Sequence, residues 1–176
     1  MIELILVPTD GSSHATAAIE LAGDIANRYG ARLVLLHVLL RNTSESEIET
    51  LCDEKGMPEA LKKKLEDLRQ ARIDLAASSY EGLSVSIPMP DDVLKDVADV
   101  ILENAKTTAE SMGASDIRTQ IVDGPAAESI IAAAKHEKAD MIIMGSRGLG
   151  KIADLFLGSV SHKVSHLATC TCVTVK

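Results

Sequence analysis

The chain has 176 residues, of which 46% are hydrophobic, so a single domain accounts for its length and can bury a sizeable core. Aromatic residues make up only 2% and tryptophan is absent, so the core must be aliphatic and platforms for stacking bases are scarce. The formal net charge of −8 repels nucleic-acid backbones and anionic lipid surfaces, which argues against both as partners.

The N-terminal residues and the cysteines indicate in which cellular compartment the protein works. Met1 to Pro8 include Glu3 and reach a proline after a few apolar residues, unlike a signal peptide or a membrane span. Three cysteines form an odd and widely spaced set, which suits a reducing environment better than a disulfide framework. We therefore expect a cytoplasmic protein.

Apolar runs that predict strands alternate along the chain with stretches that predict helices. The strand-like runs cover residues 2–7, 32–38, 116–122, 140–144 and 172–175, and the helical stretches cover about 14–29, 91–112, 125–137 and 159–168. The strands are apolar at successive positions, as expected where helices cover both faces of a sheet. This alternation predicts an α/β protein with a doubly wound, five-stranded parallel sheet.

Residues 41 to about 90 interrupt the alternation. They open with a polar, acidic stretch, followed by Pro58 and a charged helical run over 59–78. Leucines 61, 65, 68 and 75 of this run fall at heptad-like spacing, with charged residues on its other faces. We interpret the segment as an insertion after the second strand of a single domain that spans 1–176. Its helix either packs on that domain or offers a surface to an unidentified protein partner.

Two polar clusters are interpreted as ordinary surface rather than metal sites. His162 and His166 stand four residues apart on the last predicted helix, before Cys170 and Cys172, but the spacing matches no zinc pattern. The carboxylates of residues 92, 96, 99 and 103 line one face of a predicted helix and are expected to be solvated.

The segment most informative about function runs from Gly145 to Val160 and reads Gly-Ser-Arg-Gly-Leu-Gly-Lys-Ile-Ala-Asp-Leu-Phe-Leu-Gly-Ser-Val. Glycines that follow a strand let backbone N–H groups approach an anion closely, because no Cβ intervenes. Gly158 and Ser159 then open a helix, and we expect the serine to cap it. The start of that helix would present N–H donors and a positive dipole end to a phosphate.

Three nucleotide-binding patterns compete for these residues. The P-loop pattern fits up to Lys151 but has Ile152 where a serine or threonine would ligate Mg²⁺, and it follows the fourth predicted strand rather than the first. The dinucleotide pattern G-x-G-x-x-A fits from Gly148, but too little chain follows for the βαβ unit it requires. In a third pattern, two residues separate the first two glycines, and nine residues separate the second glycine from a Gly-Ser pair. This pattern fits at every position from Gly145 to Ser159.

With this third pattern the chain resembles the universal stress protein family, in the branch that carries an ATP-binding glycine signature. The resemblance extends to Ile5-Leu-Val-Pro-Thr-Asp-Gly-Ser12, to Arg32-Leu-Val-Leu-Leu-His-Val38 and to the closing part from Pro125, with Thr171 departing from a frequent proline. It covers all but the insertion. It implies a strand order of 3-2-1-4-5, with the last strand at an edge and a ligand crevice between strands one and four.

The resemblance implies an adenine-nucleotide pocket at the ends of those strands. Asp10 is expected to accept hydrogen bonds from ribose hydroxyls, or from adenine through its neighbours. The backbone N–H and C=O of Val38 are expected to bind the adenine edge. Arg147 is expected to pair with a phosphate or ribose, whereas Lys151 either contacts phosphate or is a solvated loop charge, and Asp154 caps a short turn. The expected binding residues are Pro8, Thr9, Asp10, Val38, Met144, Gly145, Arg147, Gly148, Gly158, Ser159, Val160 and Ser161.

The expected ligand is ATP, ADP or AMP, with or without Mg²⁺, and no residue is assigned as catalytic or as a metal ligand. Binding is better supported than catalysis, because neither a general base nor a dedicated metal carboxylate is evident. We therefore expect a nucleotide-dependent switch or sensor in the stress response, working as a homodimer paired through its C-terminal strand. The alternatives are a slow ATP hydrolase or phosphotransferase using the same pocket, and a nucleotide-free interaction module.

Overall fold

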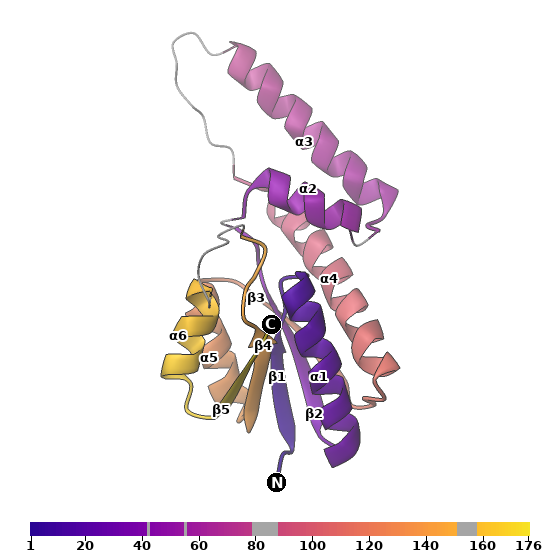
Figure 1. Ribbon diagram of the computed structural model, residues 1–176. Helices are drawn as coiled ribbons and strands as arrows, with labels where there is room; N and C mark the ends of the chain where they lie inside the picture. The colour runs from indigo at the N-terminus through magenta and orange to yellow at the C-terminus, as the bar shows by residue number, and fades with distance from the viewer. Residues whose placement is uncertain (42, 55, 79–87, 151–157) are drawn as a thin grey trace.

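A computed structural model places five parallel strands in one sheet between two layers of helices (Figure 1). It describes residues 1–41, 43–54, 56–78, 88–150 and 158–176. The strands are β1 (Leu4–Pro8), β2 (Arg32–Val38), β3 (Ile117–Val122), β4 (Met141–Gly145) and β5 (Thr171–Val175). The helices are α1 (Ser13–Tyr29), α2 (Glu45–Glu54), α3 (Glu59–Ser78), α4 (Asp91–Ser111), α5 (Ala126–Glu137) and α6 (Ser159–Leu167).

The strand order is β3-β2-β1-β4-β5, which confirms the predicted doubly wound sheet with the last strand at an edge. Helices α1 and α4 cover one face, and α5 and α6 cover the other (Figure 1). Because both faces are covered, β1 is buried at every position, as its unbroken apolar sequence predicted. The chain leaves β1 toward one edge of the sheet and β4 toward the other, so the carboxyl ends of these two neighbours flank a crevice.

The first helix, predicted over about 14–29, begins and ends with residues typical of helix ends. Ser12 is its N-cap, and the serine hydroxyl accepts a hydrogen bond from Ala15 N at 3.3 Å. The helix ends at Gly30, whose φ of 65° lies in the left-handed region that favours glycine. Small side chains on its buried face, such as Ala18 and Ala22, let α1 lie close to the sheet.

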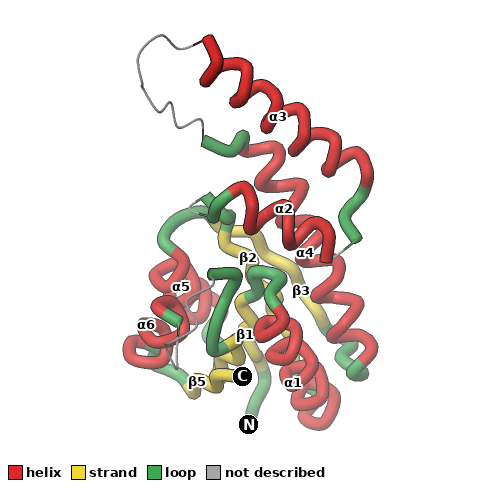
Figure 2. Tube along the Cα trace, turned by 45° about the horizontal axis from the view of Figure 1, so that its top comes forward, coloured by secondary structure: helices red, strands yellow, loops and turns green. Residues whose placement is uncertain are grey.

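The insertion forms a helical layer of its own over α4 (Figure 2). Leu61 and Leu65 of α3 are buried, whereas Leu75 is 41% exposed, so only the first part of the predicted leucine seam packs on the domain. The acidic opening of the insertion was not predicted to be helical, yet it forms α2. Ile48 and Leu51, three residues apart, bury that helix against α4, with exposures of 0% and 1%.

Ion pairs join the insertion to the rest of the domain. Lys64 Nζ on α3 lies 2.5 Å from the Asp96 carboxylate and 3.6 Å from that of Asp92, so two of the four carboxylates expected to be merely solvated are paired. Arg41 forks between Asp123, at 2.7 Å, and Asp91, at 2.8 Å. These guanidinium hydrogen bonds lower the pKa of both aspartates. Arg41, at the start of the insertion, is thus held to the residue after β3 and to the first residue of α4, where the insertion ends.

Among the described residues, no helix is long and apolar enough to cross a membrane.

Candidate functional site

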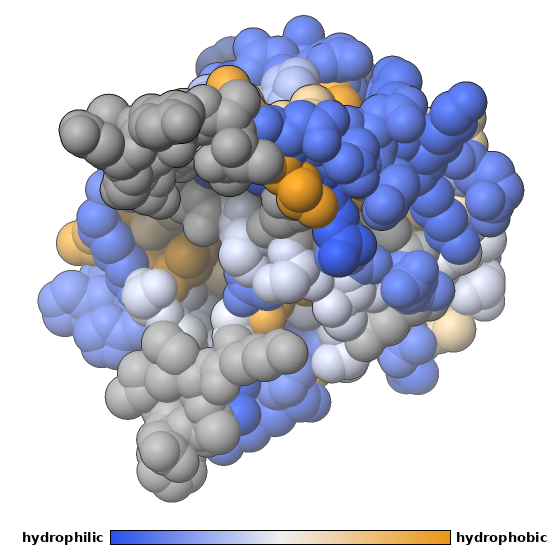
Figure 3. Space-filling view, turned by 90° about the horizontal axis from the view of Figure 1, so that it is seen from above, coloured by the Kyte–Doolittle hydropathy of each residue, from blue (hydrophilic) through white to orange (hydrophobic). Residues whose placement is uncertain are grey.

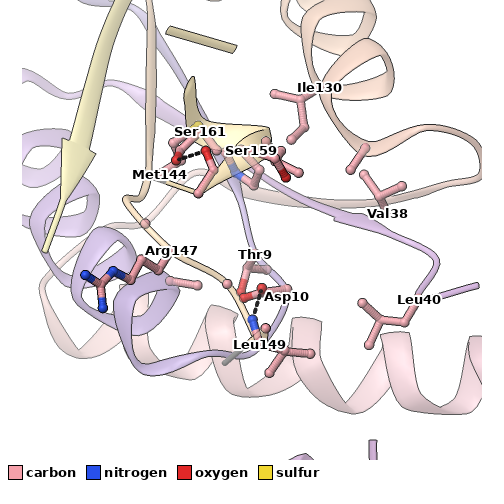
Figure 4. A pocket seen from close by; sticks show the side chains of 18 of the residues that line it. Thr9, Asp10, Val38, Leu40, Ile130, Met144, Arg147, Leu149, Ser159 and Ser161 are labelled. Carbon is pink, nitrogen blue, oxygen red and sulfur yellow. Dashed lines mark hydrogen bonds between the residues drawn. The ribbon is translucent and has the colours of Figure 1, made fainter. Parts of the chain in front are cut away.

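A cavity of about 420 Å³ opens at the carboxyl ends of β1, β2 and β4 (Figure 4). Its volume lies in the range of small-molecule sites. Figure 3 looks down on these strand ends and shows apolar surface inside a hollow. All twelve residues predicted from the sequence line the cavity. Nine further lining residues were not predicted: Ala15, Leu36, Leu40, Thr43, Glu47, Ala126, Ile130, Leu149 and Gly150.

One end of the cavity is apolar. Val38 and Leu40, at and beyond the end of β2, face Ile130 of α5 across it (Figure 4). Leu36 and Met144 are buried beneath, with exposures of 0% and 5%. Flat, apolar faces of a ligand are therefore best accommodated at this end.

The other end is formed by the glycine loop, residues 145–150 at and after the end of β4, and its three glycines differ in what surrounds them. A Cβ on Gly145 would lie 2.8 Å from the carbonyl carbon of His14 and 2.9 Å from Ala15 N, so the first glycine lets β4 pack on α1. A Cβ on Gly148 would overlap Oδ2 of Asp10, whereas one on Gly150 would meet nothing within 4 Å. Gly148 is thus the glycine that permits contact between the loop and the turn after β1.

Asp10 makes that contact. Its Oδ1 accepts from Ser12 N at 3.0 Å, and its Oδ2 accepts from Leu149 N at 3.1 Å (Figure 4). The carboxylate therefore holds the glycine loop against the first turn of the fold. Its expected contact with a ribose stays a prediction.

Ser146 connects the glycine loop to three other elements. It is 1% exposed, and its N donates to Val175 O at 2.6 Å. Its carbonyl oxygen accepts from Gly158 N at 2.8 Å and from Ser161 Oγ at 2.7 Å, and its hydroxyl lies 3.0 Å from His14 Nδ1. Sequence reasoning missed Ser146, because a serine in the variable part of the glycine pattern carries no signal of these partners.

The start of α6 corrects one expectation. Gly158, not Ser159, occupies the N-cap, and Ser159 is the first helical residue. The reason is that Gly158 has the extended backbone of a cap, with φ −69° and ψ 157°, and its N–H is fixed by Ser146 O. Glycine has no side chain with which to satisfy the N–H groups of the first turn, so this end retains the anion-attracting character of a helix start. Ser159 and Ser161 both line the cavity there (Figure 4).

Beneath the turn after β1 lies His37, which is fully buried. Its Nδ1 lies 2.9 Å from Thr9 O, and within the described residues its Nε2 has no hydrogen-bond partner. Burial lowers the pKa of the imidazole, outweighing the opposing effects of Thr9 and the Asp10 charge. The ring is therefore neutral, with Nδ1–H donating to Thr9 O, and it supports the turn that carries Asp10.

The insertion reaches the same turn. Gly11 has φ 84°, and a Cβ there would lie 2.9 Å from Leu51 Cδ1 and 3.3 Å from Ile101 Cγ1. Helices α2 and α4 thus press directly on the residue after Asp10. The insertion also supplies Thr43 and Glu47 to the cavity wall. The sequence reasoning missed Thr43 and Glu47, although the Ser44-x-x-Glu47 spacing, typical of a helix start, is a signal that could have found this helix.

Several residues weighed in the sequence lie elsewhere. Lys151, Ile152 and Asp154 fall outside the described residues. The rings of His162 and His166 stack on α6 with centroids 6.4 Å apart. In the described ranges no group of three or more His, Cys, Asp or Glu residues is arranged to hold a metal ion.

Comparison with known proteins identifies relatives of the whole chain. The model of the universal stress protein family matches residues 1–176. The universal stress protein in the QAH/OAS sulfhydrylase 3′ region of Thermus aquaticus is 33% identical over 179 residues, with 100% of each chain covered.

Two solved structures are similar to this one. Universal stress protein MJ0577 of Methanocaldococcus jannaschii superposes with a TM-score of 0.65 at 26% identity, covering 100% of this chain and 96% of that one. A universal stress protein in complex with cAMP has a TM-score of 0.63 at 24% identity, covering 99% and 97%. The second likeness shows a shared fold.

Proposed function

The chain belongs to the universal stress protein family, and from this premise we propose that its cavity binds an adenine nucleotide. The observation that carries the proposal is a single cavity joining an apolar end to a glycine loop and the start of a helix, between β1 and β4. An adenine base needs the first environment and phosphates need the second. The solved relative with cAMP supports the proposal by showing that this fold can hold an adenine nucleotide.

In the proposed complex the base lies between Val38 and Ile130, and the phosphates lie against the glycine loop and the first turn of α6. Backbone N–H groups and the hydroxyls of Ser159 and Ser161 would bind phosphate oxygens, and Arg147 would neutralise part of their charge. ATP is the preferred ligand in this proposal, with ADP and AMP using the same contacts. Asp10, beside the glycine loop, is the residue suited to a Mg²⁺ ion that accompanies the phosphates.

We propose binding rather than catalysis as the role of this site. The carboxylates of Asp10 and Glu47, which both line the cavity, accept hydrogen bonds from backbone N–H groups at 3.0–3.1 Å and so serve local structure. Neither is placed as a general base by an observed contact. Helix α2 both lines the cavity and packs on the turn after β1. A nucleotide bound in the cavity would therefore change the contacts that hold α2 in place. This link makes the protein a nucleotide-dependent switch or sensor of the cytoplasmic stress response.

The proposal is tested with the purified full-length chain. Denaturing it and chromatographing the released small molecules identifies any adenine nucleotide that co-purifies. Calorimetric titration of nucleotide-free protein with ATP, ADP and AMP should give saturable binding at one site per chain, whereas CTP should give none. The absence of ATP binding, together with an unchanged melting temperature at millimolar ATP, would overturn the proposal.

We further propose that the protein forms a homodimer through the open edge of β5. Backbone groups of Thr171 and Val175 bond to the β4 side, so the alternating residues Cys172 and Thr174 turn their N–H and C=O groups toward the edge. Thr174→Pro removes one such N–H while leaving the bonds to β4 in place. Analytical ultracentrifugation should show a dimer for the wild type and a monomer for the variant. A wild type that is monomeric at micromolar concentration would contradict the proposal.

A further inference from the structure

Glu47 is a carboxylate that the insertion adds to the cavity wall. It lies on the first turn of α2, where its Oε2 accepts from Ser44 N at 3.0 Å and from Ser44 Oγ at 2.7 Å. In return, Glu47 N donates to Ser44 Oγ at 3.3 Å. This reciprocal capping box fixes the carboxylate at the helix start and so keeps it at the cavity.

The chain path places Glu47 at the apolar end of the cavity. Val38, Leu40, Thr43 and Glu47 follow one another along the chain and all line the cavity, and Thr43 N donates to Leu40 O at 3.2 Å between β2 and α2. Val38 and Leu40 lie together in Figure 4, away from Arg147. The carboxylate thus belongs to the end where the base is proposed to lie, rather than to the phosphate end.

The chemistry of adenine restricts what a carboxylate can do there. An ionised carboxylate only accepts hydrogen bonds, and each of its two oxygens can accept from more than one donor. The ring nitrogens N1, N3 and N7 of adenine are acceptors, and the 6-amino group is the donor on its exposed edge. A carboxylate beside a bound adenine is therefore favourable only where it meets the 6-amino group.

We propose that Glu47 accepts a hydrogen bond from the 6-amino group of the bound nucleotide and makes the insertion the element that selects adenine. This assignment rests on the proposed function of the cavity. A 6-oxo purine would place an acceptor against the carboxylate, and a purine without a 6-substituent would leave the carboxylate without this donor. The insertion is then part of the recognition site.

The test compares three ligands that differ at position 6: ATP, purine riboside 5′-triphosphate, which lacks the amino group, and ITP, which has an oxo group. Wild-type protein should bind ATP about 10- to 100-fold more tightly than purine riboside triphosphate, as expected for a hydrogen bond to a charged group. Glu47→Gln keeps an oxygen for the capping box but removes the charge, and should reduce this ratio at least about fivefold. Glu47→Ala should bring it close to one.

Glu49→Gln is the matched control, because Glu49 belongs to the same helix but does not line the cavity. It should retain the wild-type ratio. The ratio within each variant cancels any general loss of affinity caused by a weakened helix start. Two results would overturn the role of Glu47 while leaving nucleotide binding intact. One is that Glu47→Gln lowers the affinities for ATP and for purine riboside triphosphate equally. The other is that wild-type protein binds ITP more tightly than ATP. Failure of all three ligands to bind wild-type protein would instead overturn the proposed function, and this assignment with it.

Discussion

Gly148→Ala tests whether contact between the glycine loop and the turn after β1 shapes the cavity. The new Cβ would overlap Oδ2 of Asp10, with Cγ of that carboxylate 3.6 Å away. The carboxylate oxygen must withdraw by about 1 Å to restore an ordinary contact. That movement breaks the 3.1 Å hydrogen bond from Leu149 N, which fixes the loop.

The size of the effect follows from the bond that is lost. A hydrogen bond to a carboxylate at a half-buried position contributes about 1–2 kcal/mol to the free energy of unfolding. For a chain of this length the melting temperature should fall by about 2–8 °C. Because Asp10 and Gly148 both line the cavity, the dissociation constant for ATP should rise about tenfold. Differential scanning calorimetry and calorimetric titration measure the two quantities.

Gly150→Ala is the control for this prediction, since a Cβ there meets nothing within 4 Å. It should leave the melting temperature within about 1 °C of the wild type. If Gly148→Ala matches Gly150→Ala in both stability and affinity, the contact with Asp10 does not shape the cavity and the reasoning is refuted.

Three further predictions concern the support of the site. His37 has a lowered pKa in the folded state, so the unfolded state binds more protons below about pH 6.5 and stability should decline as the pH falls through that value. His37→Asn keeps a donor for Thr9 O and should flatten this decline in urea titrations between pH 7 and 5; an unchanged slope would exclude His37 as its source. Leu51→Ala leaves a cavity beneath α2 and should lower the free energy of unfolding by about 2–5 kcal/mol. Leu75→Ala, at an exposed position, should change it by about 0.5 kcal/mol or less. If chemical denaturation gives similar free energies of unfolding for the two variants, α2 is not part of the core. Arg41→Gln removes the guanidinium that lowers the pKa of its two aspartate partners, so their carboxyl ¹³C titration midpoints should rise toward 3.8, and unmoved midpoints would mean that the fork does not persist in solution.

The sheet and most of the cavity could be predicted because their signals are local in the sequence. Apolar runs such as Leu4 to Val7 can be buried only in a covered strand, and the glycine spacing from Gly145 to Ser159 reflects close backbone approach. The twelve predicted residues converge because parallel strands end at the same edge of the sheet. These inferences need no knowledge of distant contacts.

The remaining features depend on partners far along the chain. Ser146 gains its role from Val175, Gly158 and His14, none of which its own neighbourhood indicates. The acidic opening of the insertion lacks a strong apolar face, so α2 is recognised only when Leu51 is seen to bury against α4. The expectation of a Ser159 cap was wrong because the bond from Gly158 N to Ser146 O, between residues well separated in the sequence, sets where α6 begins.

The insertion supplies part of the cavity wall. Its leucines bury one side of α2 and α3 on α4, while Thr43 and Glu47 face the cavity. Of the two interpretations that the sequence left open, packing on its own domain is observed for the first part of α3. A partner surface stays a prediction for the part beyond Leu68, where Ile73 and Leu75 are 51% and 41% exposed.

A titration of ¹⁵N-labelled protein with ATP, followed by NMR, tests most directly whether this cavity binds the nucleotide. The largest amide shifts should fall at Val38, at Gly145 to Gly150 and at Gly158 to Ser161, with saturation at one ATP per chain. No shifts at millimolar ATP, or shifts concentrated on the groove between α4 and β3 near Leu102 and Thr119, would contradict it.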